Sequence, residues 1–432
     1  MKTYFPLIFM GLTTVVWAGS PQLELSSPNA ILRWNEMGLS VKSTADAPVV
    51  EGTPKPVWAI RLLENPANDD YQGKTVVVED TQLQLQQKQL ADGSWEVWYP
   101  RLSWDDQTVE ISVKLTLRCV NGAFRIHAEV QNDTTRWVVA EWIGPVMAGI
   151  KANLETHPIL WPAGMGKKVS LPPTKPYEID ERTWGASHWK KQGASYEMRD
   201  QYPSQNFTMQ WIAFAGEEGG LYLASHDPTR ESKQFAVHYF EDTDRYKATI
   251  LHLPMIPAGG TWEKNLVEIY PYSGDWHVAA RHYRQWVDSW NAVGKQKPSW
   301  VDKMAGMYLV ILKQQNGRFT MWNYEDIGGQ LCDYADEQGY DFLALFGWHH
   351  GGHDHLYPEY LPAEELGGRE GLKKGIAAAK ARGKRVYLYA NGQLIDRDNQ
   401  KFWEKEGVSL TIRLKDGSLQ HEIWKKFIDS PG

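Results

Sequence analysis

The sequence contains little cysteine and no excess of positive charge. Its 432 residues include only 2 cysteines, Cys119 and Cys332, and the formal net charge is −7 at pH 7. Two cysteines so far apart do not make a disulfide framework, and we expect them to lie in different domains without forming a disulfide bond. Because no basic face is expected, nucleic acid and anionic lipid are not predicted partners.

Long apolar runs are absent after the N-terminus. Residues 4–17 are apolar but too few to span a membrane, Lys2 precedes them, and Val16 and Ala18 suit the positions before a cleavage site. These features predict a signal peptide over residues 1–18, cleaved after Ala18. They also predict a secreted or periplasmic protein with no membrane contact after cleavage. The alternative is a buried N-terminal strand, which would have to explain why Lys2 is the only charge before Glu24.

Phosphate-binding loops are also missing, whereas aromatic residues are abundant. Gly328-Gly329 and Gly367-Gly368 lack the spacing of such loops, and we expect no cofactor. The sequence has 21 Trp and 20 Tyr. Flat amphipathic rings suit the faces of sugars, although most of these rings must belong to a hydrophobic core.

Residues 19–272 have the pattern of an all-β domain. Apolar and polar residues alternate from Val109 to Val130 on both sides of Asn121-Gly122, which is typical of a hairpin turn. Asp92-Gly93 and Glu217–Gly220 separate further strand pairs in the same way. Many strands without a helical pattern predict a large antiparallel sandwich. No short repeat is present, which disfavours a propeller.

The period changes to that of a helix after residue 273. Apolar residues then recur every three to four positions, with Ser273 or Asp275 as a cap and Gly294 and Pro298 at the end. We therefore predict a connecting helix and linker over residues 273–297. Helical spacing assigns four aromatic residues to the core, namely Trp276, Tyr283, Trp286 and Trp290.

Residues 298–432 alternate between short apolar strands and helical stripes, as consecutive βαβ units do. A complete barrel of eight such units needs about 250 residues. We therefore expect the N-terminal part of a (β/α)8 TIM barrel with about three units. The expected strands are Gly306–Leu312, Asp341–Trp348 and Arg385–Gly392, and the helical stripes between them end at Gly339 and Gly383.

The loop after the second of these strands, Gly347–Pro362, carries the densest set of polar and aromatic residues. In a β/α barrel this loop lies at the C-terminal face, where substrates bind. Its rings can stack on sugars, and its histidines and carboxylates can bond sugar hydroxyls. The predicted substrate-binding residues are Trp348, His349, His350, Asp354, Tyr357, Tyr360 and, after the third strand, Asn391. The alternatives are a cluster of aromatic residues over the barrel mouth and, for Asn391, a turn cap.

The motif Gly347-Trp-His-x-Gly-Gly-x-Asp-x-x-Tyr-Pro-x-Tyr-x-Pro, with Leu366-Gly-Gly and Tyr389-Ala-Asn-Gly, resembles a bacterial family of glycoside-hydrolase-like barrel proteins. That family is related to the endo-α-N-acetylgalactosaminidases. The similarity extends over roughly residues 260–432, including Ser430-Pro-Gly432, and is only general in the sandwich.

The resemblance implies a β-supersandwich, or galactose-mutarotase-like, domain ahead of a TIM barrel. It also implies a retaining glycosidase acting on extracellular or periplasmic glycans with two carboxylates, both expected beyond Gly432. The chain would then be the N-terminal part of a longer protein and inactive by itself. Asp354, Glu359 and Asp396 are the carboxylates expected at the barrel top, and we expect Asp354 and Glu359 to contact substrate rather than to cleave it.

Two other functions remain open. The protein could bind carbohydrate without catalysis. Alternatively, His349, His350, His353 and His355 could hold metal for a hydrolase, but Gly352 interrupts the His-x-His-x-Asp-His spacing of the nearest known metal pattern, and no metal is predicted. The sequence does not predict the sugar, the linkage or the oligomeric state.

Overall fold

The structure is a computed structural model in which the chain divides into two compact units, Met1–Asn291 and Ala292–Gly432. The first fourteen residues of the predicted signal peptide, residues 292–296 of the predicted linker and the closing residues 430–432 lie outside the described part of the chain. The described residues are 15–18, 21–54, 56–64, 74–80, 83–170, 189–204, 207–291, 297–314, 319–412 and 418–421.

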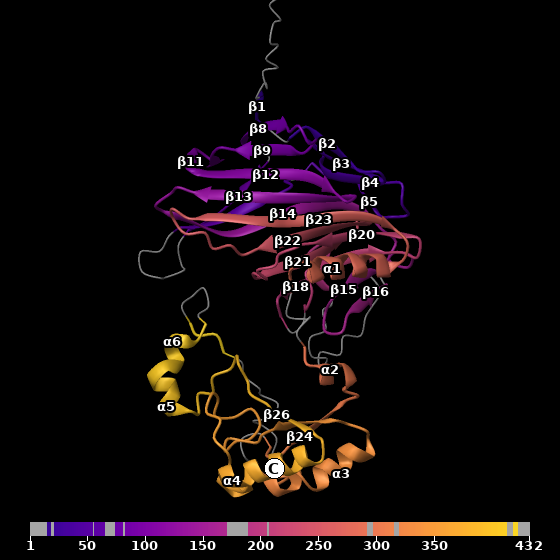
Figure 1. Cartoon of the computed structure of the whole chain (residues 1–432). Helices are drawn as coiled ribbons and strands as arrows, with labels where there is room; N and C mark the ends of the chain where they lie inside the picture. Colours follow the sequence, from indigo (N-terminus) through magenta and orange to yellow (C-terminus); the bar gives the residue numbers. More distant parts are fainter. Residues whose placement is uncertain are drawn as a thin grey trace, which may run out of the picture. The chain divides into compact units, whose positions relative to one another are not determined.

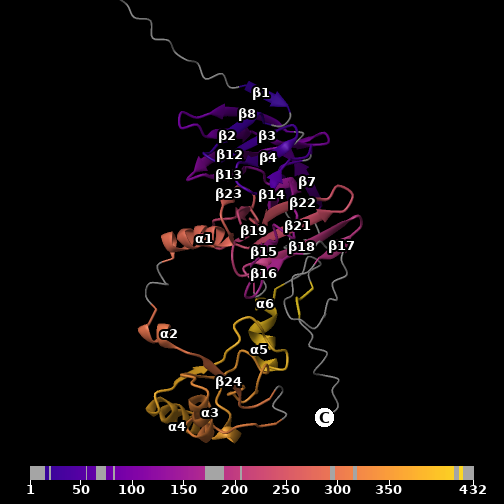
Figure 2. The same ribbon diagram turned by 90° about the vertical axis from the view of Figure 1, so that its right-hand side faces the viewer.

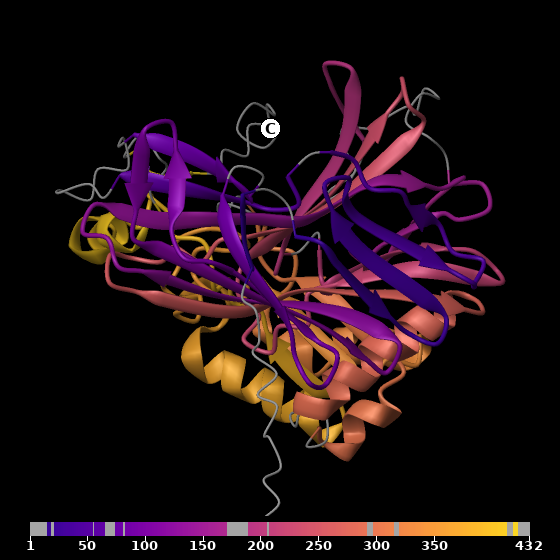
Figure 3. The ribbon, with the colours of Figure 1, turned by 90° about the horizontal axis from the view of Figure 1, so that it is seen from above.

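The first unit consists of two large antiparallel sheets (Figures 1 and 3). Within the described residues, the first sheet has 10 strands and the second has 11. In order across it, the first sheet contains β1 (Val15–Ala18), β8 (Gln84–Gln89), β9 (Trp95–Tyr99), β12 (Ile111–Val120), β13 (Ala123–Asn132), β23 (Thr261–Ser273), β20 (Gly219–Ala224), β19 (Trp211–Ala215), β15 (Ile159–Trp161) and β16 (Lys167–Val169).

The second sheet is arranged around the longest strand, β14 (Trp137–Lys151). β6 pairs with its residues 137–143, and β22 pairs with its residues 142–150. The other strands are β17 (Lys190–Gln192), β18 (Ser195–Tyr202), β21 (Lys233–Phe240), β22 (Arg245–His252), β5 (Val49–Val50), β4 (Gly38–Ser43), β3 (Ala30–Asn35), β2 (Leu23–Ser26), β6 (Ala59–Glu64) and β7 (Thr75–Glu79), and a separate pair is formed by β10 (Leu102–Trp104) and β11 (Gln107–Val109).

The three predicted hairpins are confirmed. β12 pairs with β13 from Ile111↔Asn132 to Val120↔Ala123. The turn between them has φ of 52° at Asn121 and 82° at Gly122, the left-handed pair that matches the twist of a two-residue hairpin. The pairs β8–β9 and β19–β20 flank the other two predicted turns.

The alternating apolar residues of both sheets form one core, which confirms the predicted β-sandwich. Along β12 and β13, every second residue is buried, because successive side chains on a strand point to opposite faces. Four fully buried indoles dominate the core: Trp34, Trp58, Trp142 and Trp161. β1 pairs antiparallel with β8, while the signal peptide and its cleavage after Ala18 remain predictions.

The predicted helix is α1 (Trp276–Trp290), and it belongs to the first unit. The carboxylate of Asp275 caps it by accepting a hydrogen bond from the His277 amide at 3.1 Å. The helix lies against β19, β20 and β23 of the first sheet (Figure 2).

The expectation that all four aromatic residues of α1 are core was wrong for Trp276, which is 46% exposed. Tyr283, Trp286 and Trp290 are partly buried. Helical spacing identifies residues that share a face, but it does not tell how far along the helix the covering sheet extends.

The second unit contains the three predicted parallel strands, β24 (Met307–Ile311), β25 (Phe342–Phe346) and β26 (Arg385–Leu388). Two α-helices, with short 3-10 turns before each, follow the first two strands, as in βαβ units (Figure 1). The remaining elements are α2 (Ser299–Lys303), η4 (Tyr324–Ile327), α3 (Gln330–Glu337), η5 (Glu364–Leu366), α4 (Gly368–Ala381), α5 (Gln400–Phe402), the π turn η6 (Trp403–Gly407) and α6 (Val408–Leu410).

The two faces of this small sheet differ in burial. Leu343 and Leu345 lie in a core with residues of η4, α3 and α4. On the opposite face, Met307 and Leu309 are each 49% exposed and Tyr387 is 42% exposed. The described residues therefore form three βα units with one covered sheet face, and a closed barrel is not among them.

Two further observations concern the whole chain. Cys119 lies on β12 and Cys332 on α3, in different units, and both are free thiols. Within the ranges described above, no helix is long and apolar enough to cross a membrane.

Candidate functional site

The predicted loop lies at the C-terminal edge of the three-stranded sheet. Lys313, Gly347 and Tyr389 follow the ends of β24, β25 and β26 within a few residues. Because the strands are parallel, these three chain segments meet at one edge, which is the substrate side of β/α barrels.

The hydroxyl of Tyr324 fixes both ends of this loop. It donates to the Trp348 carbonyl at 2.5 Å and accepts from the Ala363 amide at 2.7 Å, and the side chain is fully buried. The Lys313 ammonium group donates to the His350 carbonyl at 2.6 Å and pairs with the carboxylate of Glu365. The loop is therefore attached to its own unit by buried polar contacts.

Two of the three residues predicted to stack on sugar, Trp348 and Tyr357, are buried and pack against other side chains of the protein. Trp348 is 8% exposed, and its indole donates to the Tyr389 carbonyl at 2.8 Å. Its ring stacks on Tyr360, with centroids 6.0 Å apart and 17° between the planes. Tyr357 is 2% exposed. These contacts favour the aromatic-cluster alternative for Trp348 and Tyr357, and they leave Tyr360 partly accessible.

Asp354 lies over this aromatic cluster and is exposed to solvent. Tyr357 donates a hydrogen bond of 2.5 Å to its carboxylate. Burial and the negative charge of Asp354 raise the pKa of Tyr357 far above its ordinary value, so the phenol remains a donor. The backbone of Asp354 is left-handed, with φ of 55°, a conformation that Asp tolerates better than most residues.

The four histidines of the loop face different partners. His349 is buried, and burial with the neighbouring charge of His350 lowers its pKa to about 4, which keeps the imidazole neutral. His350 lies 3.3 Å from Glu359, and His353 lies 3.4 Å from Asp354. Among the described residues, His349, His350 and His353 do not belong to a group close enough to share a metal ion, whereas His355 does, with Asp396 and Asp398.

Asn391 and Asp396 shape the backbone next to the loop. The Asn391 side-chain oxygen accepts from the amides of Gln393 and Leu394, each at 2.9 Å, which supports the turn-cap alternative. Asp396 accepts from the Leu356 amide at 2.7 Å. Of the polar side chains of the loop, His349 is buried, His350, His353 and His355 are partly exposed, and Asp354 and Glu359 are exposed.

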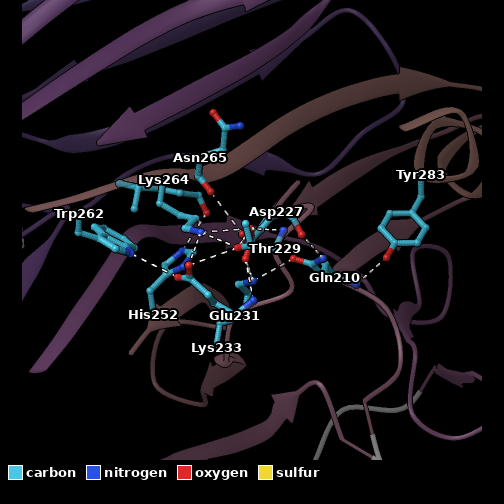
Figure 4. Close-up of polar contacts among 12 residues, drawn as sticks. Gln210, Asp227, Thr229, Glu231, Lys233, His252, Trp262, Lys264, Asn265 and Tyr283 are labelled. Atoms are coloured by element: carbon cyan, nitrogen blue, oxygen red, sulfur yellow. Dashed lines mark hydrogen bonds and ion pairs between the residues drawn. The ribbon is translucent and has the colours of Figure 1, made fainter. Parts of the chain in front are cut away.

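The sandwich contains a buried charged cluster that sequence reasoning missed (Figure 4). Asp227 and Lys233 are 1% and 0% exposed, and their charged groups are 2.8 Å apart. Lys264 lies 3.1 Å from the same carboxylate, and Gln210 accepts from Lys233 at 2.9 Å. Burial raises the pKa of Asp227, but the two ammonium groups outweigh this and hold the pKa far below its ordinary value.

A second polar group of the sandwich lies between its first sheet and α1. It comprises His226, Glu268 and His282, whose ligand atoms all lie within 4.8 Å of one another. A cavity of about 60 Å³ beside it is lined by Arg125, His226, Asn265, Val267, Glu268 and Trp286. Sequence reasoning missed this group, because its members are 14 to 56 residues apart and share no short ligand spacing.

Comparisons with known proteins found one family model and several solved structures that are similar to this chain. The model of a domain of unknown function, DUF6259, matches residues 265–431, and no curated protein matches the chain. Structures of α-N-acetylgalactosaminidase NagBb from Bifidobacterium bifidum are similar to 93% of this chain. A quadruple mutant has a TM-score of 0.60 at 15% identity, and the GalNAc complex has a TM-score of 0.57 at 14% identity.

The chain spans 64% of the NagBb chain in the first of these structures and 63% in the second. A galactose mutarotase-like protein from Lactobacillus casei matches this chain with a TM-score of 0.36 and 12% identity. The match covers 58% of this chain and 100% of that protein. That score is too low to assign the sandwich, so its mutarotase-like character remains a prediction. At these identities, the likeness to NagBb is one of fold.

Proposed function

We propose that this protein acts on glycans outside the cytoplasm as the N-terminal part of a glycoside-hydrolase-like protein. The observation that carries the proposal is the likeness of 93% of the chain to an α-N-acetylgalactosaminidase, which spans the sandwich and the parallel unit. In this proposal, the three βα units are the opening of a TIM barrel, and its remaining units cover the apolar face on which Met307 and Leu309 are exposed.

The proposed mechanism is retaining hydrolysis by two carboxylates, with the catalytic pair beyond Gly432. The loop carboxylates are poor candidates for bond cleavage. Asp354 accepts from Tyr357, and Glu359 lies beside His350 on the same loop, whereas the pair must flank the sugar from two sides. Their proposed role, with His350 and Tyr360, is to contact sugar hydroxyls and ring faces.

Sugar binding by the 432-residue protein tests the site. N-acetylgalactosamine and galactose are titrated separately while ligand signals are followed by saturation-transfer NMR. We expect Asp354→Asn and Glu359→Gln to weaken binding about tenfold or more, because hydrogen bonds to charged groups contribute about 1.5–3 kcal/mol. The control is Glu337→Gln, an exposed carboxylate at the end of α3. Equal binding by all four proteins would overturn the site.

Hydrolysis tests the mechanism separately. We expect no turnover of p-nitrophenyl α-N-acetylgalactosaminide by the 432-residue chain, and turnover by a polypeptide that continues past Gly432. Turnover by the shorter chain would place the catalytic pair within it. Binding without turnover by the longer polypeptide would support the second candidate, a carbohydrate-binding protein without catalysis. An intact-mass measurement on the secreted native protein tests both export and cleavage after Ala18.

A further inference from the structure

The cluster of His226, Glu268 and His282 lies entirely within the first unit and takes no part in the proposed glycan site. Glu268 is on β23, His226 lies two residues after the end of β20, and His282 is on α1. β20 and β23 are neighbours in the sheet, with Ala224 opposite Glu268, and α1 packs over them. Three separate elements therefore bring two imidazoles and one carboxylate to one place.

The ligand atoms are close enough to share one ion. His226 Nδ1 lies 3.4 Å from one oxygen of Glu268, and His282 Nε2 contacts the other. Zn²⁺ binds nitrogen and oxygen at about 2.0–2.2 Å, so two of its ligands lie at most about 4.4 Å apart. The three ligand atoms lie within 4.8 Å of one another, so at most a small movement of the side chains is needed.

His226 provides a second observation. The residue is 6% exposed, and among the described residues its buried Nδ1 makes no hydrogen bond, although it faces the Glu268 carboxylate at 3.4 Å. Its other nitrogen, Nε2, lies 2.9 Å from the hydroxyl of the buried Tyr222. A histidine that bonds a partner through one ring nitrogen and directs the other at a shared point has the arrangement of a metal ligand.

Both imidazole rings are held in position by aromatic neighbours. The ring of His226 stacks on Trp286, with centroids 4.6 Å apart and 5° between the planes. The ring of His282 stacks on Tyr270 at 4.7 Å and meets Tyr222 edge-on at 5.3 Å. This fixed orientation reduces the conformational entropy that metal binding would cost.

The carboxylate of Glu268 has one oxygen directed at each side of the cluster. Arg125 pairs with one of its oxygens, and the other faces His282.

We propose that His226, Glu268 and His282 bind a first-row divalent cation of the Zn²⁺ type. Two histidines and one glutamate form a known Zn²⁺ ligand set that leaves a coordination position for water. The adjacent cavity of about 60 Å³ has room for water, and Asn265 lines it. Tyr222 acts as a positioning residue through His226. Arg125, which pairs with Glu268, lowers the affinity for the cation but is not one of its ligands.

Zn²⁺ alone is the probe. The chelator-treated 432-residue protein is titrated with Zn²⁺ in competition with a chromophoric chelator. We expect one saturable site, weakened more than about 100-fold by His282→Gln and by Glu268→Gln. Tyr222→Phe should weaken it about 10- to 100-fold, the usual effect of a residue that orients a ligand.

Two histidine variants serve as matched controls. His277→Gln changes an exposed histidine on the same helix, and His355→Gln changes the other candidate ligand group in the second unit. Neither should change the affinity of the proposed site. Absence of saturable binding, or loss of binding in His355→Gln but not in Glu268→Gln, would overturn the proposal.

A spectroscopic measurement keeps the test valid if a variant folds poorly. Co²⁺ bound to the wild-type protein should give the visible absorption of a four- or five-coordinate site with nitrogen and oxygen ligands. The band should shift in Tyr222→Phe, whose phenyl ring keeps the packing but lacks the hydroxyl. An octahedral hexa-aqua spectrum in the wild-type protein would overturn the proposal.

Discussion

The two units differ in how the faces of their sheets are covered. In the sandwich, two sheets cover each other, and the core is closed enough to enclose charged side chains such as Asp227 and Lys233. Within the described residues of the second unit, the parallel sheet is covered on one face only, and buried polar contacts hold a surface loop. The closed core encloses Asp227 and Lys233 as a charged pair, whereas the open sheet has its polar residues at the strand ends.

The buried charges of the sandwich give the largest expected effect. Asp227→Asn would leave Lys233 and Lys264 without their shared carboxylate. We expect the free energy of unfolding to fall by about 3–5 kcal/mol, because an uncompensated buried charge remains. Urea unfolding followed by hydrogen exchange in residues 207–291 measures it. Arg284→Ala, which removes an exposed ion pair of α1, should leave the exchange unchanged. An equal loss of stability in Asp227→Asn and Arg284→Ala would contradict the claim that a buried ion pair matters more than an exposed one.

The two faces of the parallel sheet give the next largest effect. Leu345→Ala removes a fully buried side chain and should cost about 2–5 kcal/mol, whereas Leu309→Ala on the exposed face should cost less than about 1 kcal/mol. Hydrogen exchange of β25 and β26 in urea measures the difference. An equal loss in both variants would mean that the face carrying Leu309 is covered in solution.

Asp80 provides a pH test of burial in the sandwich. Burial raises its pKa from 3.8 to about 7. The folded protein therefore binds this proton more tightly than the unfolded chain, and stability falls as pH rises from about 4 to about 7. Asp80→Asn keeps the acceptor for the Val57 amide and should gain on the order of 2–4 kcal/mol at pH 8, because one pKa unit corresponds to about 1.4 kcal/mol.

Urea midpoints at pH 4, 6 and 8 measure this effect. The wild-type protein and the Asn variant should be nearly equal in stability at pH 4, where the carboxyl group is mostly protonated in the folded protein. A constant difference between them at all three pH values would show that the titration of Asp80 is not the cause.

The loop anchor in the second unit gives the smallest effect. Tyr324→Phe removes the hydroxyl that joins Trp348 and Ala363, and it should cost about 1–3 kcal/mol. Hydrogen exchange should accelerate in residues 348–363 while the sandwich stays unchanged. The control is Tyr334→Phe, whose hydroxyl accepts a hydrogen bond from the exposed Gln330 at 2.6 Å. Unchanged exchange in the loop would contradict the anchoring role.

Much of the local structure could be predicted from the sequence. The turn at Asn121-Gly122, the cap at Asp275 and the three parallel strands lie where the patterns place them. Each depends on residues close in the chain, since turn conformation, capping and side-chain alternation are set by the backbone over a few residues. The position of the Gly347–Pro362 loop followed because parallel strands end at one edge.

The roles of individual site residues were harder to predict. The ring of Trp348 stacks on Tyr360, and the side chain of Asn391 caps a turn. Two residues predicted to contact sugar therefore make contacts within the protein instead. Composition shows that a loop contains rings and polar groups, but not which of them pack on each other. That choice depends on Tyr324, which lies more than twenty residues before the loop.

The sequence by itself determined a β-sandwich followed by parallel βα units, because hydrophobic periodicity and turn residues act locally. Only the tertiary structure decided which distant groups meet. Asp227 pairs with Lys264, and His226 meets Glu268 and His282, because of the order of strands in the first sheet and the packing of α1. Sheet order is fixed by the burial of whole faces, and so a short stretch of sequence does not encode it.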